Sequence, residues 1–491
     1  MSRSIEEIAQ ELEKYAIQMN EQRYNQAAGL EYDKNKMEAI SQVLLNLSNE
    51  FLHSYTEPRS LYLHCISAIA DARKLPISLE IYETRNKLIA SDKFQYNEKP
   101  VNWGSWRQFN AQANNKDRKD LFDEFIAKAP GIASLIEKKF IISKQVYSLY
   151  ESSPLQAYLE KEFISYDNLV DLVTKLGDES KKSFLEAADH YAPEILGKDH
   201  FEYFDDFYVA RGKIYSPLNK YFIKKNPLKI IRHMLVEWGF EENLSRISVD
   251  SEDREKKSPS AFCFSVSVPN DIRVIYKKVS PFSDFTSIFH EFGHAIHGSS
   301  GIAADPYWIR YLIPMSVAET FSIFLETLLE NPLFLEKELD LPEEAINEII
   351  DRRHFMGLYF LVFYSANSLM KLEYWKRDYS IEQASSVWSN LTKRFFFEIP
   401  GNYWLLHHIT PNYDLYAPSY ILASIRVNEW INQMMDEYGD LFWREKQAGG
   451  VFRDLAATRG LFDLSVWDMN PTPYLESQMK FSFNQKENPD K

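Results

Sequence analysis

Cysteine is nearly absent from this chain of 491 residues, which contains only Cys65 and Cys263. Two cysteines cannot form the disulfide framework of a small secreted domain, and they cannot form a cysteine-rich metal site. We therefore expect the protein to work in a reducing compartment. Cys263 is most simply a small buried apolar residue, because no base that could activate its thiol lies near it in the sequence.

Long apolar runs are also lacking. The most apolar stretch, residues 357–370, is too short and too polar to span a bilayer. The first fifteen residues, MSRSIEEIAQELEKY, carry charges every few positions, where a signal peptide would need an apolar segment. We therefore expect a cytoplasmic protein that does not bind membranes.

Positive charge is in deficit, since 56 Lys and Arg face 71 Asp and Glu and leave a net charge of −15. This sign excludes a general nucleic-acid binder. The chain is 45% hydrophobic and 26% charged, which is ordinary for a globular protein, and it exceeds the size at which a single core stops growing. We expect a folded protein with at least two packed lobes and no nucleic-acid partner.

Glycine is scarce, with 16 residues, and apolar residues recur at three- and four-residue spacing over long stretches. This pattern predicts a mainly α fold. At the first helix, Ser4 and Glu7 can form a capping box, and Ile5, Ile8 and Leu12 then share one face. A different pattern occupies residues 261–277.

Residues 261–268 (AFCFSVSV) and 272–277 (IRVIYK) are rich in β-branched and aromatic residues, and the connector Pro269-Asn270-Asp271 has turn chemistry. These segments predict a β-hairpin. An exposed edge strand of this hairpin could bind an extended peptide through main-chain hydrogen bonds, with Ala261 and Phe262 as its substrate-binding residues. Burial of the hairpin between lobes is the alternative.

The sequence HEFGH places His290 and His294 four positions apart in a segment with helical periodicity. Residues four apart lie on one face of a helix, so the two imidazoles can bind one Zn²⁺. Glu291 lies between them and can act as a general base instead of binding the metal. The alternative is a chance match formed by two solvated helix histidines. His297, three residues further on, is better explained by packing than by metal binding.

A catalytic zinc needs a third protein ligand, and the helical segment PMSVAETFSIFLE offers Glu319. The loop after His294 contains Gly298 and Gly301, which can turn the chain so that the next helix brings Glu319 back to the histidines. Glu326 lies two turns further on the same face and could accept a hydrogen bond from a ligand histidine. An exposed surface carboxylate is the alternative for Glu326.

The segment HITPNYDLYAPSY supplies phenols and imidazoles that could donate to a developing oxyanion without competing for zinc. His408, Tyr413 and Tyr420 have this chemistry. From the residues alone, packing explains them equally well, because the chain has 29 tyrosines. His407 and Tyr416 are weaker candidates in the same segment.

HEFGHAIH, the spacing to Glu319 and the AExxSxxxE string that ends at Glu326 together resemble the zinc oligopeptidases that include thimet oligopeptidase and oligoendopeptidase F, most closely the latter. The resemblance covers roughly residues 200–425. It implies that Tyr413, five residues after His408, binds substrate. It also implies that His408 and Tyr420, twelve residues apart, are catalytic, with Tyr420 stabilising the oxyanion. It also implies one Zn²⁺ per chain and a cleft that admits only short unstructured peptides.

We therefore predict a mainly α fold of two helical lobes around a deep substrate cleft, with a small β-sheet beside an HExxH zinc site. The N-terminal helical lobe is expected over residues 1–198 and the zinc peptidase lobe over residues 199–481, with interleaving allowed, followed by a flexible tail over residues 482–491. The predicted function is hydrolysis of internal peptide bonds by zinc-activated water, with Glu291 as general base. A zinc carboxypeptidase that trims C-termini and a catalytically silent peptide-binding protein are the alternatives. The sequence does not fix the oligomeric state.

Overall fold

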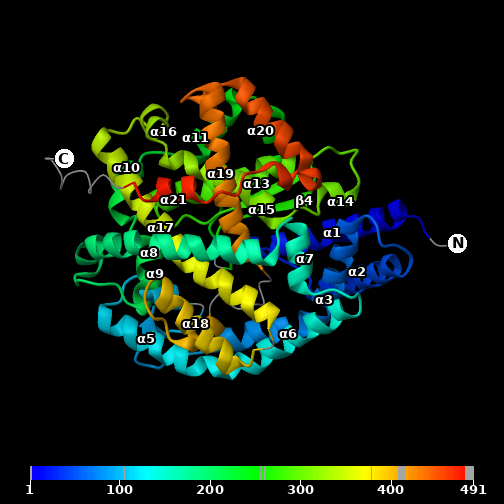
Figure 1. Ribbon diagram of the computed structural model, residues 1–491, viewed down its shortest axis with the longest axis horizontal. Helices are drawn as coiled ribbons and strands as arrows, with labels where there is room; N and C mark the ends of the chain where they lie inside the picture. The colour runs from blue at the N-terminus through cyan, green and yellow to red at the C-terminus, as the bar shows by residue number, and fades with distance from the viewer. Residues whose placement is uncertain are drawn as a thin grey trace.

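The computed structural model describes residues 3–103, 105–254, 256–258, 260–377, 379–406 and 415–480. Figure 1 shows a mainly helical molecule with little β-structure, which confirms the predicted fold class. No helix within these ranges combines the length and the apolar character that crossing a membrane requires.

The helices that precede the central sheet are α1 (Ile5–Ala28), α2 (Lys34–Ser54), α3 (Arg59–Asn86), α4 (Trp106–Asn110), α5 (Asn115–Lys128), α6 (Ala133–Ser148), α7 (Pro154–Lys161), α8 (Tyr166–Leu196), α9 (Asp206–Tyr208), α10 (Asn219–Phe222), α11 (Pro227–Glu237) and α12 (Glu241–Ser245). Those that follow it are α13 (Pro281–Ser299), α14 (Tyr307–Arg310), α15 (Met315–Thr327), α16 (Pro332–Lys337), α17 (Glu343–Lys376), α18 (Ile381–Phe395), α19 (Tyr416–Tyr438), α20 (Lys446–Thr458) and α21 (Thr472–Gln478).

Helix α1 begins where its sequence predicts. Glu7 N–H donates to Ser4 Oγ at 3.2 Å and Ser4 N–H donates to Glu7 Oε2 at 2.8 Å, which completes the capping box. The helix ends at Gly29, which adopts φ 71° and ψ 25°. This left-handed conformation is easily reached only without a Cβ, and a Cβ here would also meet the backbone of Lys257.

The central sheet has the order β3-β5-β4, formed by β3 (Ile247–Asp250), β4 (Phe262–Ser267) and β5 (Asp271–Ile275). Strands β4 and β5 form the predicted antiparallel hairpin, with Cys263 opposite Val274. Strand β3 runs parallel to β5 and was not expected, because its four residues are too few for a clear pattern. A separate two-stranded sheet joins β1 (Gln95–Tyr96) to β2 (Lys99–Pro100).

Two large hydrophobic cores organise the molecule. One lies among α5, α6, α8, α18 and the second part of α17, and the other surrounds the central sheet, α13, α15 and α20. Helices α17 and α19 contribute buried residues to both cores, so these two helices join them. In Figure 1, α8 and α17 cross the middle of the molecule between the upper and lower helices. The division of the chain at residue 198 stays a prediction.

Helices α1, α2 and α3 gather at one end of the molecule, where α1 packs beside β4 (Figure 1). Asn20 on α1 donates its side-chain amide to the carbonyl of Ser265 on β4 at 3.2 Å, and Tyr24 makes an edge contact with Phe264. Because β5 pairs with the other side of β4, α1 covers the outer edge of this strand at Ser265.

Candidate metal and active site

Helix α13 carries the HEFGH segment and has two different faces. Pro281 occupies its first position, which suits a residue without an N–H, and the buried face includes Phe285, Phe289 and Phe292. His290 and His294 lie on the other face, where their side chains keep about one-fifth of their surface exposed. The apolar residues thus anchor the helix in the core and leave the imidazoles at the surface of a site.

Gly293 sets how closely α15 approaches α13. A Cβ at this position would overlap the carbonyl oxygen of Phe321 and the Cα atom of Ser322, both on α15. The missing side chain therefore lets the two helices touch at the backbone. This contact lies within one turn of His290 and His294, so it brings the next helix against the histidines.

Glu319 on α15 meets both histidines, as the sequence predicts. Its Oε2 lies 3.5 Å from His290 Nε2 and 3.7 Å from His294 Nε2. One ligand atom from each of the three residues lies within 4.8 Å of the others. A tetrahedral zinc with bonds of about 2.1 Å separates its ligand atoms by about 3.4 Å. These three donors therefore fit a zinc ion without large rearrangement.

Each imidazole also makes a hydrogen bond through the ring nitrogen that faces away from Glu319. His290 Nδ1 lies 3.0 Å from Glu326 Oε2, and His294 donates a hydrogen bond to the backbone carbonyl of Ala318. A histidine that gives its second N–H to such an acceptor presents its other nitrogen to a metal. Glu326 thus takes the supporting position that the sequence offered it.

Glu326 is itself fixed by a buried cation. Arg353 on α17 donates to Glu326 Oε1 at 2.8 Å and pairs with Glu330 at 2.6 Å. Although burial opposes ionisation, the charge of Arg353 and the hydrogen bond from His290 lower the pKa of Glu326 to about 2. The carboxylate behind His290 is therefore ionised at neutral pH.

Glu319 is nearly fully buried, with 1% of its surface exposed. Ser322 donates to its Oε2 at 2.9 Å, and the hydroxyl of Tyr416 on α19 donates to its Oε1. Burial, followed by the negative charge of Glu319, raises the pKa of Tyr416 above its usual value. The phenol therefore remains a hydrogen-bond donor, and it orients the carboxylate toward the histidines.

The histidines respond to different surroundings. Burial disfavours the charged form of His290, but the hydrogen bond to Glu326 and the nearby carboxylates outweigh it and raise its pKa to about 10. Burial lowers the pKa of His294 to about 4. The carboxylates around His290 therefore favour a positive charge at this site, which either a protonated imidazole or a bound divalent cation can provide.

Glu291 lies beside this cluster and does not join it. Burial raises the pKa of its carboxyl to about 7, although the charge of His290 and a hydrogen bond from the backbone N–H of Cys263 act in the opposite direction. A carboxyl group with a pKa near neutrality is suited to take up and release a proton. Its contact with Cys263 places the start of β4 at the site.

The predicted residues of β4 differ in exposure. Phe262 exposes 44% of its surface, which is unusual for a large apolar side chain, whereas Ala261 and Cys263 are half-buried. Burial raises the pKa of the Cys263 thiol well above its usual value, so this thiol is not activated as a nucleophile.

Of His408, Tyr413 and Tyr420, only Tyr420 lies in the described part of the chain. His408 and Tyr413 fall within residues 407–414, outside the described residues, as does His407. The ring of Tyr420 makes edge contacts with Tyr416 at 5.0 Å and Tyr364 at 5.5 Å. Burial and the charge of Glu319 raise its pKa well above its usual value, so its hydroxyl keeps its proton.

His297 is buried and stacks on Phe321 with ring centroids 4.2 Å apart. It is not one of the three residues whose ligand atoms converge. This arrangement agrees with the packing interpretation.

A buried carboxylate from the first half of the chain meets the start of α15. Glu162, 5% exposed, accepts hydrogen bonds from Ser316 N at 3.2 Å, from the Ser316 hydroxyl and from Ser419 Oγ on α19 at 3.1 Å. Arg426 of α19 donates to Thr320 of α15 at 2.7 Å. These bonds tie together the helix that carries Glu319 and the helix that carries Tyr420.

Sequence reasoning did not single out Arg353 or Glu162, and it ranked Tyr416 low. Each acts through a partner far away in the sequence, and none belongs to a motif with a fixed spacing. The helical pattern offers one signal for Tyr416, because it lies one turn before Tyr420 and shares its face.

A family model and several solved structures match this chain. Residues 233–437 match the model of peptidase family M3. None of the curated proteins compared matches the chain.

Solved structures share the fold at low sequence identity. A protein assigned as an oligoendopeptidase F from Bacillus anthracis str. Ames is 12% identical with a TM-score of 0.57, covering 95% of this chain and 84% of its own. PZ peptidase A, solved with inhibitor 2, is 13% identical with a TM-score of 0.58, covering 99% and 96%. BsuCP is 14% identical with a TM-score of 0.58, covering 98% of both chains.

The predicted resemblance is thus confirmed: residues 233–437 match the model of peptidase family M3, and solved structures that include one assigned as an oligoendopeptidase F share the fold of the whole chain.

Proposed function

We propose that this protein is a cytoplasmic zinc metallopeptidase that hydrolyses internal peptide bonds of short unstructured peptides, with one Zn²⁺ per chain. One observation carries the proposal. His290, His294 and Glu319 converge at the ligand spacing of a tetrahedral zinc, while Glu291 lies beside them as an additional carboxyl group. A binding protein without catalysis would have no use for that additional carboxyl group.

When bound to these three residues, zinc would supply a Lewis acid that acidifies water and polarises the peptide carbonyl. The chain's own groups then move the proton. Glu291, a carboxyl group beside the proposed ligands and outside their set, accepts a proton from the attacking water and delivers it to the leaving amine. Tyr420 donates its hydroxyl to the oxygen that becomes negative.

Tyr413 is proposed to bind the substrate and His408 to act as a catalytic residue that contacts it, as the family resemblance implies. The peptide backbone is proposed to pair with the start of β4 at Ala261 and Phe262, where the exposed ring of Phe262 offers an apolar contact. This pairing is limited in length, because Asn20 already occupies the carbonyl of Ser265. We therefore expect only a few substrate residues to pair with this strand.

The test combines metal analysis with cleavage of internally quenched fluorescent peptides of graded length. We expect close to one zinc per chain, loss of cleavage after chelation and recovery when zinc is added. Cleavage that persists in a verified metal-free sample would contradict the proposal. Each peptide is also tested with an amidated C-terminus, because an endopeptidase still cuts it and a carboxypeptidase does not.

A further inference from the structure

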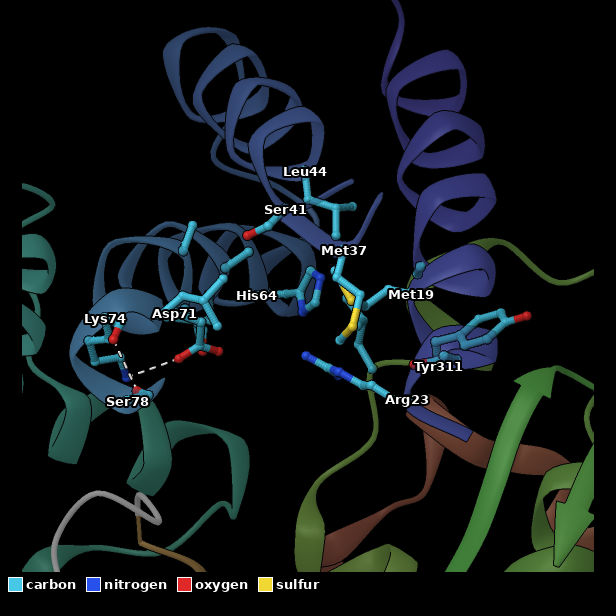
Figure 2. A pocket seen from close by; sticks show the side chains of 18 of the residues that line it. Met19, Arg23, Met37, Ser41, Leu44, His64, Asp71, Lys74, Ser78 and Tyr311 are labelled. Atoms are coloured by element: carbon cyan, nitrogen blue, oxygen red, sulfur yellow. Dashed lines mark hydrogen bonds and ion pairs between the residues drawn. The ribbon is translucent and has the colours of Figure 1, made fainter. Parts of the chain in front are cut away.

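A second feature of the molecule lies outside the metal site. A cavity of about 880 Å³ opens between α1, α2 and α3 on one side and residues 307–314 on the other (Figure 2). Those residues lead directly into α15, which carries Glu319. None of His290, His294, Glu291 or Glu319 lines this cavity.

The lining of the cavity is rich in cationic side chains, although the protein as a whole is acidic. Six cationic side chains line it against three carboxylates, although the whole chain has a net charge of −15. The cations are Arg23, Lys34, Arg59, Lys74, Lys139 and Lys161, and the carboxylates are Glu38, Asp71 and Glu160. This local excess opposes the overall charge and attracts anions.

Part of this charge is already paired. Lys74 lies 2.9 Å from Asp71, and Arg59 lies 2.6 Å from Glu160. Arg23 has no ion-pair partner among the residues that the structure describes, and Figure 2 shows its guanidinium extending into the cavity toward His64. Arg23 is therefore available to a ligand.

His64 adds a neutral polar group to the wall. Its Nε2 lies 3.3 Å from the hydroxyl of Tyr307. Burial, together with the positive charge of Lys161, lowers its pKa to about 4. The imidazole therefore offers hydrogen bonds at neutral pH and adds no charge of its own.

The cavity lies at the far end of β4 from the metal site. Asn20 and Tyr311 both line it: Asn20 contacts β4 at Ser265, and the hydroxyl of Tyr311 accepts a hydrogen bond from the N–H of Val268, the residue after β4. The other end of β4 touches Glu291 through Cys263. Because a strand rises about 3.3 Å per residue, the four steps from Cys263 to Ser267 span about 13 Å.

We propose that this cavity binds a carboxylate carried by the peptide substrate about four residues from the scissile bond, with Arg23 as the principal recognition group. The inference rests on the proposed function for the position of the scissile bond. A peptide extended along β4 leaves the strand where Asn20 covers Ser265 and enters the cavity. The carboxylate belongs either to an Asp or Glu side chain or to the C-terminus of the peptide.

The test measures binding, so that it does not depend on turnover. An alanine-based decapeptide with one Asp moved through every position is compared with matched Asn and Lys peptides, using the zinc-loaded Glu291→Gln protein. Each peptide is measured with a free and an amidated C-terminus. We expect that, at one or two positions, the peptide with Asp binds more tightly than the matched peptide with Asn and much more tightly than the one with Lys. If the C-terminus is the ligand, amidation weakens binding instead.

Arg23→Gln identifies the group responsible. We expect it to reduce the preference for the carboxylate by roughly two- to fivefold, as for other partly exposed ion pairs. Lys14→Gln is the matched control, because Lys14 is an exposed cation on the same helix and does not line the cavity. It removes the same charge and should leave the preference unchanged.

Two results would overturn the cavity proposal. One is equal binding of Asp, Asn and Lys peptides at every position with no effect of amidation, and the other is an identical response of the two variants. Failure of the proposed function looks different, because the parent would then cleave no peptide while the Arg23-dependent preference persisted. A preference that Lys14→Gln also abolishes would indicate only long-range attraction and would refute a role for the cavity.

Discussion

The support behind His290 can be tested by removing Glu326. In Glu326→Ala the imidazole loses the acceptor that lies 3.0 Å from its Nδ1, while all three proposed ligands remain. Losing such a supporting group typically weakens metal binding 10- to 100-fold. Because Arg353 holds the carboxylate in place at 2.8 Å, we expect the upper part of this range, about 30- to 100-fold.

In free energy this is about 2.0 to 2.7 kcal/mol, since each tenfold change corresponds to about 1.4 kcal/mol. Glu330→Ala is the matched control. Glu330 also pairs with Arg353, at 2.6 Å, but the structure gives it no contact with His290. We expect this variant to weaken zinc binding by less than about threefold, because Glu326 keeps its place.

Zinc affinity is measured by competition with a chromogenic chelator, on samples whose helical content is verified by circular dichroism. Glu319→Ala completes the series, and it should weaken binding by more than either of the other changes because it removes a ligand. Equal losses in Glu326→Ala and Glu330→Ala would refute the role given to the His290 hydrogen bond. Equal losses in Glu319→Ala and Glu326→Ala would show that the wrong carboxylate has been chosen as ligand.

Three further changes give distinct outcomes. Tyr420→Phe removes one hydroxyl, so kcat should fall roughly 10²- to 10³-fold with a smaller change in KM and unchanged zinc content, and a near-normal kcat would return Tyr420 to a packing role. Glu162→Gln should lower the free energy of unfolding in urea by about 1–3 kcal/mol, because it disturbs a buried network, whereas Glu160→Gln, two residues earlier at the end of α7, should lower it by less than about 1 kcal/mol. The pKa of His64 is lowered to about 4 in the folded protein, so as the pH falls this residue is protonated in the unfolded chain before it is protonated in the folded one. Through this partly exposed group, the free energy of unfolding should fall by about 1–2 kcal/mol between pH 7.5 and pH 5. A His64→Gln variant with the same loss over that pH range would show that other groups cause it.

The sequence was sufficient for those parts of the molecule that depend on local pattern. The capping box fixed the start of α1, the dense β-branched residues marked β4 and β5, and the spacing of His290 and His294 placed both on one helical face. The third proposed ligand, Glu319, needed one more step in the prediction, because only a returning helix could bring it back to the two histidines. Gly293 explains why that return is so close, although its role was invisible before the helices were in place.

The groups that sequence reasoning missed all depend on distant contacts. Glu162 meets Ser316 across 154 positions, and Arg353 meets Glu326 from a different helix. The cationic cavity combines α1, α2 and α3 with residues 307–314, which no spacing within one segment could reveal. Burial also changes chemistry, as for Glu291, whose pKa of about 7 follows from its surroundings and not from its residue type.

The most direct test of the central claim is Glu291→Gln, which keeps the size of the side chain and removes its ability to accept a proton at neutral pH. Zinc content, peptide affinity and turnover are measured on one preparation. We predict that zinc and peptide still bind while turnover falls by about 10²- to 10⁴-fold, as expected for loss of a general base. Turnover within a few-fold of the parent, with zinc still bound, would contradict the assignment of Glu291 and the mechanism built on it.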